Sequence, residues 1–149
     1  MAKRGKKART PRAFVLDGSV TMAWFFRDET NAYAEAVEDS LAHAEAVVPA
    51  HWPLEVVNTL VVGERRQRST EAQAAIWLSY LRALPILVDD ETAIRSWDDT
   101  LSLARAHQLS AYDAAYLELA LRRSLSLATL DERLKDAAAA VGLAEYKPV

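Results

Sequence analysis

The chain has 149 residues, of which 51% are hydrophobic and none is cysteine. This length and composition predict one compact domain with its own core, and the lack of cysteine excludes disulfides, thiolate nucleophiles and cysteine-based zinc sites. Residues 1–12 hold six of the 18 Lys and Arg residues and no acid, so residues 13–149 carry 12 cations against 21 acids. We therefore expect a basic, disordered arm over residues 1–12 and a single acidic domain over residues 13–149.

Short apolar runs alternate along the chain with longer segments of helical composition. The first half predicts a strand over 13–17, a helix over 19–26, a helix over 30–45 capped by Thr30, a strand over 46–48, and helices over 51–68 and 70–84. The second half predicts a strand over 86–88, helices over 90–107 and 110–124, a strand over 125–129, a helix over 131–141 and a weak edge strand over 144–147.

Strands that alternate with helices predict a three-layer α/β/α sandwich with a central parallel sheet of four to five strands. No apolar stretch approaches the roughly 20 residues of a membrane span, and no secretory signal follows the basic N-terminus. A chain without cysteine also suits a reducing compartment. We therefore expect a cytoplasmic protein that makes no membrane contact.

Four acidic residues, Asp17, Glu55, Asp113 and Asp131, lie where a strand should end or a helix should begin. In parallel sheets ligands bind beyond the carboxyl ends of the strands, so we expect these carboxylates to meet at one edge. Gathered carboxylates repel one another unless a cation joins them, and all-oxygen sites favour Mg²⁺ or Mn²⁺. A divalent ion held in this way is suited to cleaving phosphodiesters.

Each of these acids also has a local structural role that could account for it. Asp17 can begin an Asp-Gly turn, Asp113 stands three residues after Ser110 in a capping pattern, and Asp131 can cap the last helix. Glu55 suits the positive end of its helix. Because four separate local causes would not all select the same sheet edge, we favour a shared site.

Three polar neighbours support the shared site. Ser19 follows Asp17 by two residues and Thr129 precedes Asp131 by two, positions from which a hydroxyl can orient a carboxylate or a metal-bound water. Asn58 lies one turn beyond Glu55 and interrupts an apolar stretch, although a plain surface position would also account for it. We therefore expect all three to support the acidic site.

The order of these motifs resembles that of PIN-domain nucleases, and the chain length resembles that of the VapC-like toxins of type II toxin–antitoxin systems. The resemblance rests on four segments of this chain, which are Phe14-Val15-Leu16-Asp17-Gly18-Ser19, Pro53-Leu54-Glu55-Val56-Val57-Asn58, Leu109-Ser110-Ala111-Tyr112-Asp113-Ala114-Ala115-Tyr116 and Leu127-Ala128-Thr129-Leu130-Asp131. Together they cover the chain from residue 13 to about residue 145.

The resemblance implies a Mg²⁺- or Mn²⁺-dependent endoribonuclease that is paired with an antitoxin protein. It implies Asp17 and Asp113 as principal metal ligands, with Glu55 and Asp131 bound directly or through water. The basic arm is then either a solvated tail or an electrostatic aid to binding RNA phosphates.

Other functions remain open at this point. A phosphatase of the haloacid dehalogenase type would carry an Asp-x-Asp motif at the end of the first strand. In this chain Ser19 stands where the second acid of that motif would be. A response-regulator receiver would need an acidic pair near the first strand and a Lys near the last, and neither is evident. A housekeeping PIN nuclease in RNA processing and a non-catalytic PIN-like interaction module both stay possible. The three histidines lack the HExxH spacing of zinc sites, so we expect ordinary surface or core roles for them.

The helices over 51–68 and 70–84 carry more apolar residues than packing on a sheet requires. These residues are Trp52, Val56, Leu60, Ile76, Trp77 and Tyr80. Exposed apolar patches of that size usually mark interfaces, and two-fold pairing is the commonest way to cover one. We therefore expect a homodimer that leaves the acidic edge open.

Overall fold

The computed structural model describes residues 12–26, 28 and 31–149. Within these residues there are four strands, β1 (Arg12–Leu16), β2 (Ala44–Val48), β3 (Ile86–Val88) and β4 (Ser126–Ala128). The helices are α1 (Gly18–Phe25), α2 (Ala32–Ser40), α3 (Trp52–Arg65), α4 (Glu71–Ala83), α5 (Thr92–Arg95), α6 (Leu101–His107), α7 (Ala111–Arg123) and α8 (Glu132–Ala140). A π-helical segment, Ser96–Thr100, joins α5 to α6.

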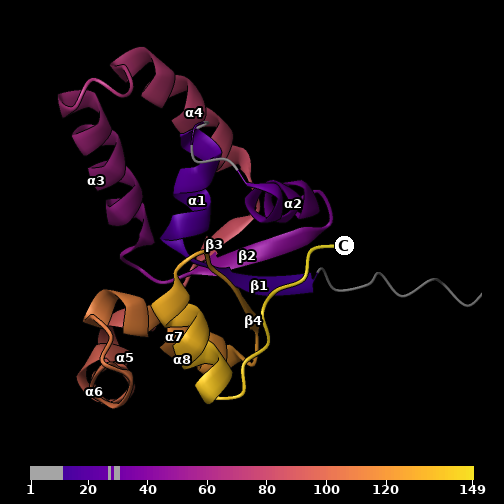
Figure 1. Cartoon of the computed structure of the whole chain (residues 1–149), viewed down its shortest axis with the longest axis vertical. Helices are drawn as coiled ribbons and strands as arrows, with labels where there is room; N and C mark the ends of the chain where they lie inside the picture. The colour runs from indigo at the N-terminus through magenta and orange to yellow at the C-terminus, as the bar shows by residue number, and fades with distance from the viewer. Residues whose placement is uncertain (1–11, 27, 29–30) are drawn as a thin grey trace, which may run out of the picture.

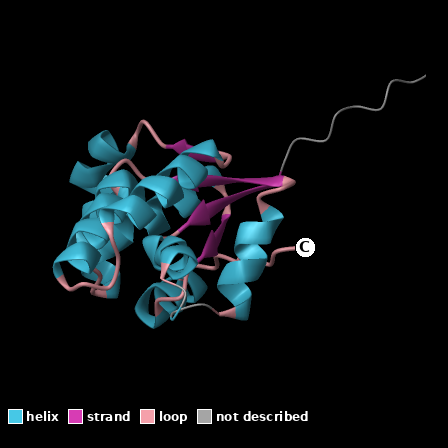
Figure 2. Ribbon diagram, turned by 90° about the horizontal axis from the view of Figure 1, so that it is seen from above, coloured by secondary structure: helices cyan, strands magenta, loops and turns pink. Residues whose placement is uncertain are grey.

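The strands form one parallel sheet in the order β3-β2-β1-β4. Helices α1 to α4 lie on one side of the sheet and α5 to α8 on the other (Figure 1). Figure 2 shows the same strands between helices when they are seen from above. The predicted three-layer α/β/α sandwich is confirmed, and burial on both faces explains why the strands read as apolar runs.

The core lies on both faces of β1 and β2 and includes the C-terminal segment. Phe14, Val15, Leu16 and Val47 are fully buried. The Tyr146 ring stacks on Phe14 with centroids 3.8 Å apart. An isolated parallel bridge between Leu127 and Glu145 places this segment beside β4, where the sequence predicts a weak edge strand.

One predicted helix, over residues 30–45, is wrong at its C-terminal end. Helix α2 stops at Ser40, and Ala44 and Glu45 belong to β2, where they pair with β1. Sheet pairing outweighs the helical preference of this alanine-rich stretch. The Asn31 side chain accepts a hydrogen bond from Ala34 N at 2.7 Å and caps the helix. Thr30, the predicted cap, lies outside the described residues, as do residues 1–11 of the basic arm. Arg12, which we expected to belong to the disordered arm, is instead the first residue of β1.

A second predicted helix, over residues 90–107, starts later and is divided. The Thr92 hydroxyl donates to Asp89 Oδ2 at 2.9 Å and accepts from Ala50 N at 3.0 Å, so the chain before Thr92 is held as a loop. The π-helical segment then separates α5 from α6. Sequence periodicity does not distinguish such a segment from a continuous α-helix.

The predicted apolar interface on α3 and α4 is largely wrong, because α3 buries its apolar residues inside the domain. Trp52, Val56 and Leu60 are buried, and the Trp52 indole donates to Thr21 Oγ1 at 3.1 Å. Trp77 packs against Phe25 with ring centroids 4.9 Å apart. Ile76 and Tyr80 remain exposed. Among the described helices, none is long and apolar enough to cross a membrane.

Candidate active site

The fold brings the four predicted acids to the carboxyl edge of the sheet. Asp17 directly follows β1 and precedes α1, whereas Glu55 and Asp113 lie in the first turns of α3 and α7. Asp131 follows β4 and is the N-cap of α8. Asn58 lies exposed on α3, one turn beyond Glu55. Parallel strands and the helices that follow them therefore gather residues that are far apart in the sequence.

Asp17 is the most enclosed of the four acids, with 5% of its surface exposed. Ser19 Oγ and Thr129 Oγ1 both donate to Asp17 Oδ2, at 2.6 Å and 2.8 Å. Burial raises the pKa of Asp17 to about 6, and the charges of Glu55 and Asp113 add to that rise while the two hydroxyls oppose it. The predicted support of Asp17 by hydroxyls therefore exists as direct hydrogen bonds.

Glu55 is held between α3 and α7. His51 Nε2 lies 2.9 Å from Glu55 Oε1, and the Tyr116 hydroxyl donates to Glu55 Oε2 at 3.2 Å. Oε2 also approaches Gly18 so closely that a Cβ there would lie 2.6 Å from it. Any larger residue at position 18 would force this carboxylate to move from its place.

Asp113 and Asp131 belong to the acidic group, and each also takes part in capping the start of a helix. The Ser110 hydroxyl accepts from Asp113 N at 3.1 Å, and Asp131 Oδ1 accepts from Leu134 N at 2.9 Å, so both helix starts carry the caps expected from the sequence. Burial raises the pKa of Asp113, and the negative charges of Asp131 and Glu55 raise it further. Asp113 is therefore within electrostatic reach of two other members of the group.

The donor set of this edge suits a hard divalent cation. It offers carboxylate and hydroxyl oxygens, which Mg²⁺ and Mn²⁺ prefer. Within the described residues, no Lys or Arg forms an ion pair with any of the four acids. Because burial and mutual repulsion already raise the pKa values of Asp17 and Asp113, a bound cation would relieve an unfavourable charge. These residues therefore fit a metal site, although the four carboxylates are more widely spaced than a second acidic group.

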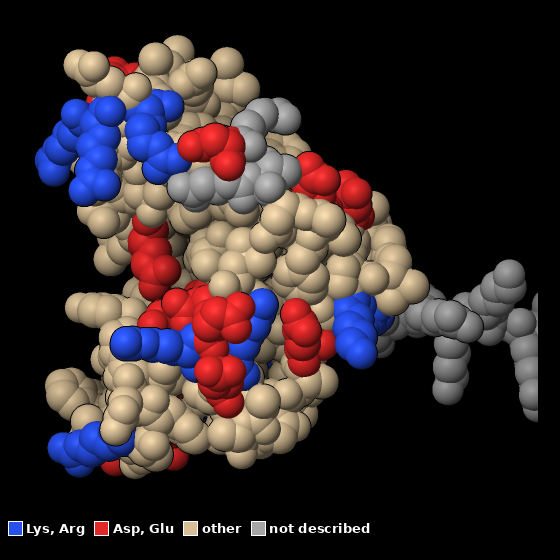
Figure 3. Space-filling view, in the orientation of Figure 1, with Lys and Arg blue, Asp and Glu red and all other residues tan. Residues whose placement is uncertain are grey.

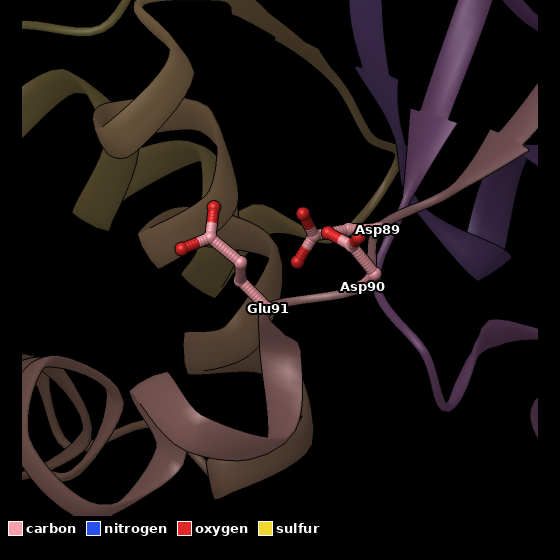
Figure 4. Close-up of side chains that lie close together, drawn as sticks. All are labelled: Asp89, Asp90 and Glu91. Carbon is pink, nitrogen blue, oxygen red and sulfur yellow. The ribbon is translucent and has the colours of Figure 1, made fainter.

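That second group is Asp89, Asp90 and Glu91, which follow β3 (Figure 4). It is the one set of three possible metal ligands in the described part of the chain whose oxygens all lie within 4.8 Å of one another. The Arg122 guanidinium binds Asp89 Oδ2 at 2.7 Å and Glu91 Oε2 at 3.1 Å. Arg122 therefore already supplies a cation to two of the three carboxylates.

Glu118, one turn before Arg122 on α7, completes this ion cluster, with its Oε1 2.7 Å from Arg122 Nε. Burial opposes ionisation of Asp89, but hydrogen bonds from Arg122 and Thr92 outweigh it and hold the pKa of Asp89 below its usual value. The sequence analysis missed this cluster. Two signals were available, because Asp89 follows a strand as Asp17 does and Glu118 precedes Arg122 by one helical turn.

His51 is a further residue that the sequence analysis missed, since we expected an ordinary role for it. Its spacing of four residues before Glu55 was the available signal.

A groove of about 750 Å³ between α1, α2 and α4 is lined by aromatic residues that include Phe25, Trp77 and Tyr80. None of the four acids lines this groove, so it does not mark the acidic site. Figure 3 shows cationic side chains gathered at the far end of α3 and acidic ones near the middle of the molecule.

Comparisons with known proteins identify the family of this chain. Residues 14–140 match the family model described as PIN domain. The chain is 30% identical over 131 residues to Ribonuclease VapC3 of Mycobacterium tuberculosis, in strains CDC 1551 / Oshkosh and ATCC 25618 / H37Rv, which covers 88% of this chain and 91% of the relative.

Two solved structures share the fold. FitAcB from Neisseria gonorrhoeae matches with a TM-score of 0.62 and 21% identity, over 91% of this chain and 97% of that chain. A toxin–antitoxin complex from Klebsiella pneumoniae matches with a TM-score of 0.58 and 16% identity, over 91% of this chain and 98% of that chain. The family match and the curated relative confirm the predicted resemblance. This chain belongs to the PIN-domain family and is a relative of the VapC ribonucleases.

Proposed function

We propose that the protein is a metal-dependent endoribonuclease that acts in the cytoplasm as the toxin of a toxin–antitoxin pair. The observation that carries this proposal is the buried Asp17 carboxylate, which is oriented by two hydroxyls and lies within electrostatic reach of Glu55 and Asp113. No Lys or Arg in the described residues offsets this charge by an ion pair. Family membership and the VapC relative add support for the ribonuclease activity.

In this proposal Asp17 and Asp113 are the principal ligands of Mg²⁺ or Mn²⁺. Glu55 and Asp131 complete the site directly or through water, and Asn58 is a supporting residue near Glu55. When bound, the divalent ion polarises the attacking water and offsets the charge that builds on the phosphate. Ser19 and Thr129 hold Asp17 Oδ2, which leaves the other oxygen of this carboxylate for the ion.

The Tyr116 hydroxyl donates to one oxygen of Glu55, and His51 Nε2 lies beside the other. The carboxylate therefore has a defined orientation before any ligand binds, which is the role of supporting contacts around a metal ligand. Gly18 keeps the space for it. Because these contacts exist before the substrate binds, the side chains need little reorganisation when it arrives.

The test of the proposed function is cleavage of mixed RNAs by the purified protein with Mn²⁺ and with EDTA. We expect cleavage only with the metal. Asp113→Asn should lower the rate by orders of magnitude, because a ligand charge is lost. The matched control is Asp136→Asn, which should retain activity, because Asp136 is an exposed acid on α8 outside the group of four. Equal cleavage with and without EDTA, or none with any divalent metal, would count against the proposal.

We also propose that the antitoxin partner covers the acidic edge and places a basic side chain among the carboxylates. Four gathered acids without a paired Lys or Arg in the described part of the chain are complementary to such a side chain. Expression of the protein alone should then arrest growth, and Asp113→Asn should abolish the arrest. Harmless expression of an active enzyme would instead favour the alternative function, a housekeeping role in RNA processing.

A further inference from the structure

The aromatic side chain at the rim of the acidic site has no role in the proposed chemistry. Tyr112 directly precedes Asp113 in the first turn of α7, and 67% of its surface is exposed. An exposed tyrosine ring presents a large apolar face to water together with a polar hydroxyl tip, a combination typical of binding surfaces. Because Tyr112 lies next to a proposed metal ligand, its ring is placed to contact a molecule that binds at the same site.

Two rings, those of His51 and Tyr116, connect Tyr112 to the Glu55 carboxylate. The His51 ring lies 5.8 Å from Tyr112 and 5.3 Å from Tyr116, centroid to centroid, and so lies near both tyrosines. Both His51 and Tyr116 contact Glu55. Tyr112 and Tyr116 are one helical turn apart and therefore point to the same side of α7. The rings run from the exposed Tyr112 to the buried Tyr116, and the half-buried His51 ring lies near both.

Because the domain is acidic, a contact that does not depend on charge would strengthen its binding to RNA. Residues 13–149 contain 12 cations against 21 acids, so phosphate attraction to this part of the chain is weak. Arg122, which lies on the same helix as Tyr112, already binds Asp89 and Glu118. Base stacking on aromatic rings does not depend on charge, and every base has a face that can stack.

We propose that Tyr112, supported by His51, is a base-stacking site for a nucleotide next to the scissile phosphate in single-stranded RNA. This inference rests on the proposed ribonuclease function. It selects single-stranded or looped RNA, because bases within a duplex are already stacked on their neighbours and cannot cover the ring. The ligand is thus an unpaired nucleobase of any sequence, held a short distance from the four acids.

The test compares Tyr112→Ala, Tyr112→Phe and the control Tyr80→Ala on one single-stranded RNA that the wild type cuts. Tyr80 is an exposed tyrosine on α4, which does not carry any of the four acids. The same RNA is also made with an abasic nucleotide on either side of the cleaved bond. The measured quantity is kcat/KM in Mn²⁺, after circular dichroism has shown that each variant is folded.

We expect Tyr112→Ala to lower kcat/KM on intact RNA by about tenfold, which is within the range of one lost base stack. Tyr112→Phe and Tyr80→Ala should stay near the wild-type value. On one of the two abasic RNAs the wild type should show a similar loss, and there Tyr112→Ala should cause no further loss, because the stacked base is already missing.

Wild-type kcat/KM for Tyr112→Ala on intact RNA would overturn the stacking site while the ribonuclease function still stands. An equal loss on intact and on both abasic RNAs would also overturn it, because the ring would then act without a base. If RNA cleavage is unchanged but a labelled oligo-arginine peptide binds Tyr112→Ala more weakly, the ring belongs to a basic protein segment instead. A wild type that cuts no RNA would remove the ribonuclease function and the stacking site together.

Discussion

At the scale of single residues, Asp17 shows why the acidic site opposes its own folding. Its carboxylate is buried and its pKa is raised from 3.8 to about 6, first by burial and then by the neighbouring charges. The folded protein therefore binds this proton more tightly than the unfolded chain. Between these two pKa values the free energy of unfolding falls as the pH rises. Above both values this decrease in stability is complete.

We predict that Asp17→Asn stabilises the metal-free protein at pH 7 while it abolishes cleavage. The stabilisation is at most about 3 kcal/mol, because it corresponds to a pKa shift of roughly two units. Urea denaturation in EDTA at pH 7 and pH 4 measures it. The difference between variant and wild type should shrink at pH 4, where Asp17 is largely protonated in the folded wild type. A variant that is less stable than the wild type at pH 7 would contradict this prediction.

The residues of this site could be predicted to different extents. Asp17 with Ser19, and Asp131 with Thr129, follow apolar strands at short spacing, so the local pattern is sufficient to find them. The bond between Thr129 and Asp17 spans 112 residues and depends on β1 pairing with β4. No local pattern contains that pairing.

At the scale of secondary-structure elements, α7 links the acidic site to the ion cluster. Its first turn carries Asp113, and its last turn carries Arg122, which joins the helix to the loop after β3 through Asp89. Asp89 and Glu118 are both buried, so their charges depend on this guanidinium. Removal of one partner from a buried ion pair leaves an uncompensated charge.

We therefore predict that Arg122→Met destabilises the protein by about 3–5 kcal/mol, because two buried carboxylates lose their cation. Arg123→Met is the matched control, since the neighbouring Arg123 is exposed and its loss should change the free energy of unfolding by less than about 0.5 kcal/mol. Urea denaturation at pH 7 measures both variants. Equal stability of the two would show that the cluster contributes nothing.

The element boundaries show where sequence patterns stop being sufficient. All four strands were predicted, because apolar runs of this length that end at polar or proline residues are typical of buried strands and too short for most helices. The end of α2 and the division of the helix over 90–107 were not predicted. Ala44 joins β2 because a neighbouring strand is available, and the Asp89 loop is held by Thr92 and Arg122. Both causes are tertiary contacts.

At the scale of the whole molecule, the proposed homodimer needs a different surface from the one predicted. The predicted residues Trp52, Val56 and Leu60 belong to the core. Exposed apolar residues instead lie along α5, the π-helical segment and α6, where Ile94, Trp97 and Leu101 are 70%, 80% and 42% exposed. This segment lies on the side of the sheet opposite α4 (Figure 1).

We predict that the protein is a homodimer that pairs through this segment, and that Ile94→Glu makes it monomeric. Ile76→Glu on α4 is the matched control, because Ile76 is 75% exposed and Ile94 is 70% exposed. Sedimentation at micromolar concentration measures the mass of both variants and of the wild type. A monomeric wild type would exclude the dimer, and loss of the dimer only in Ile76→Glu would assign the interface to α4.

The central claim is that the four acids, rather than the group after β3, bind the catalytic divalent ion. Calorimetric titration of the folded protein with Mn²⁺ tests this claim most directly, with Asp113→Asn compared against Asp90→Asn. Asp90 is an exposed member of the group formed by Asp89, Asp90 and Glu91. We predict that Asp113→Asn weakens Mn²⁺ binding by at least about tenfold, since a direct ligand charge is lost, and that Asp90→Asn binds like the wild type. Weakened binding in Asp90→Asn with wild-type binding in Asp113→Asn would contradict the claim.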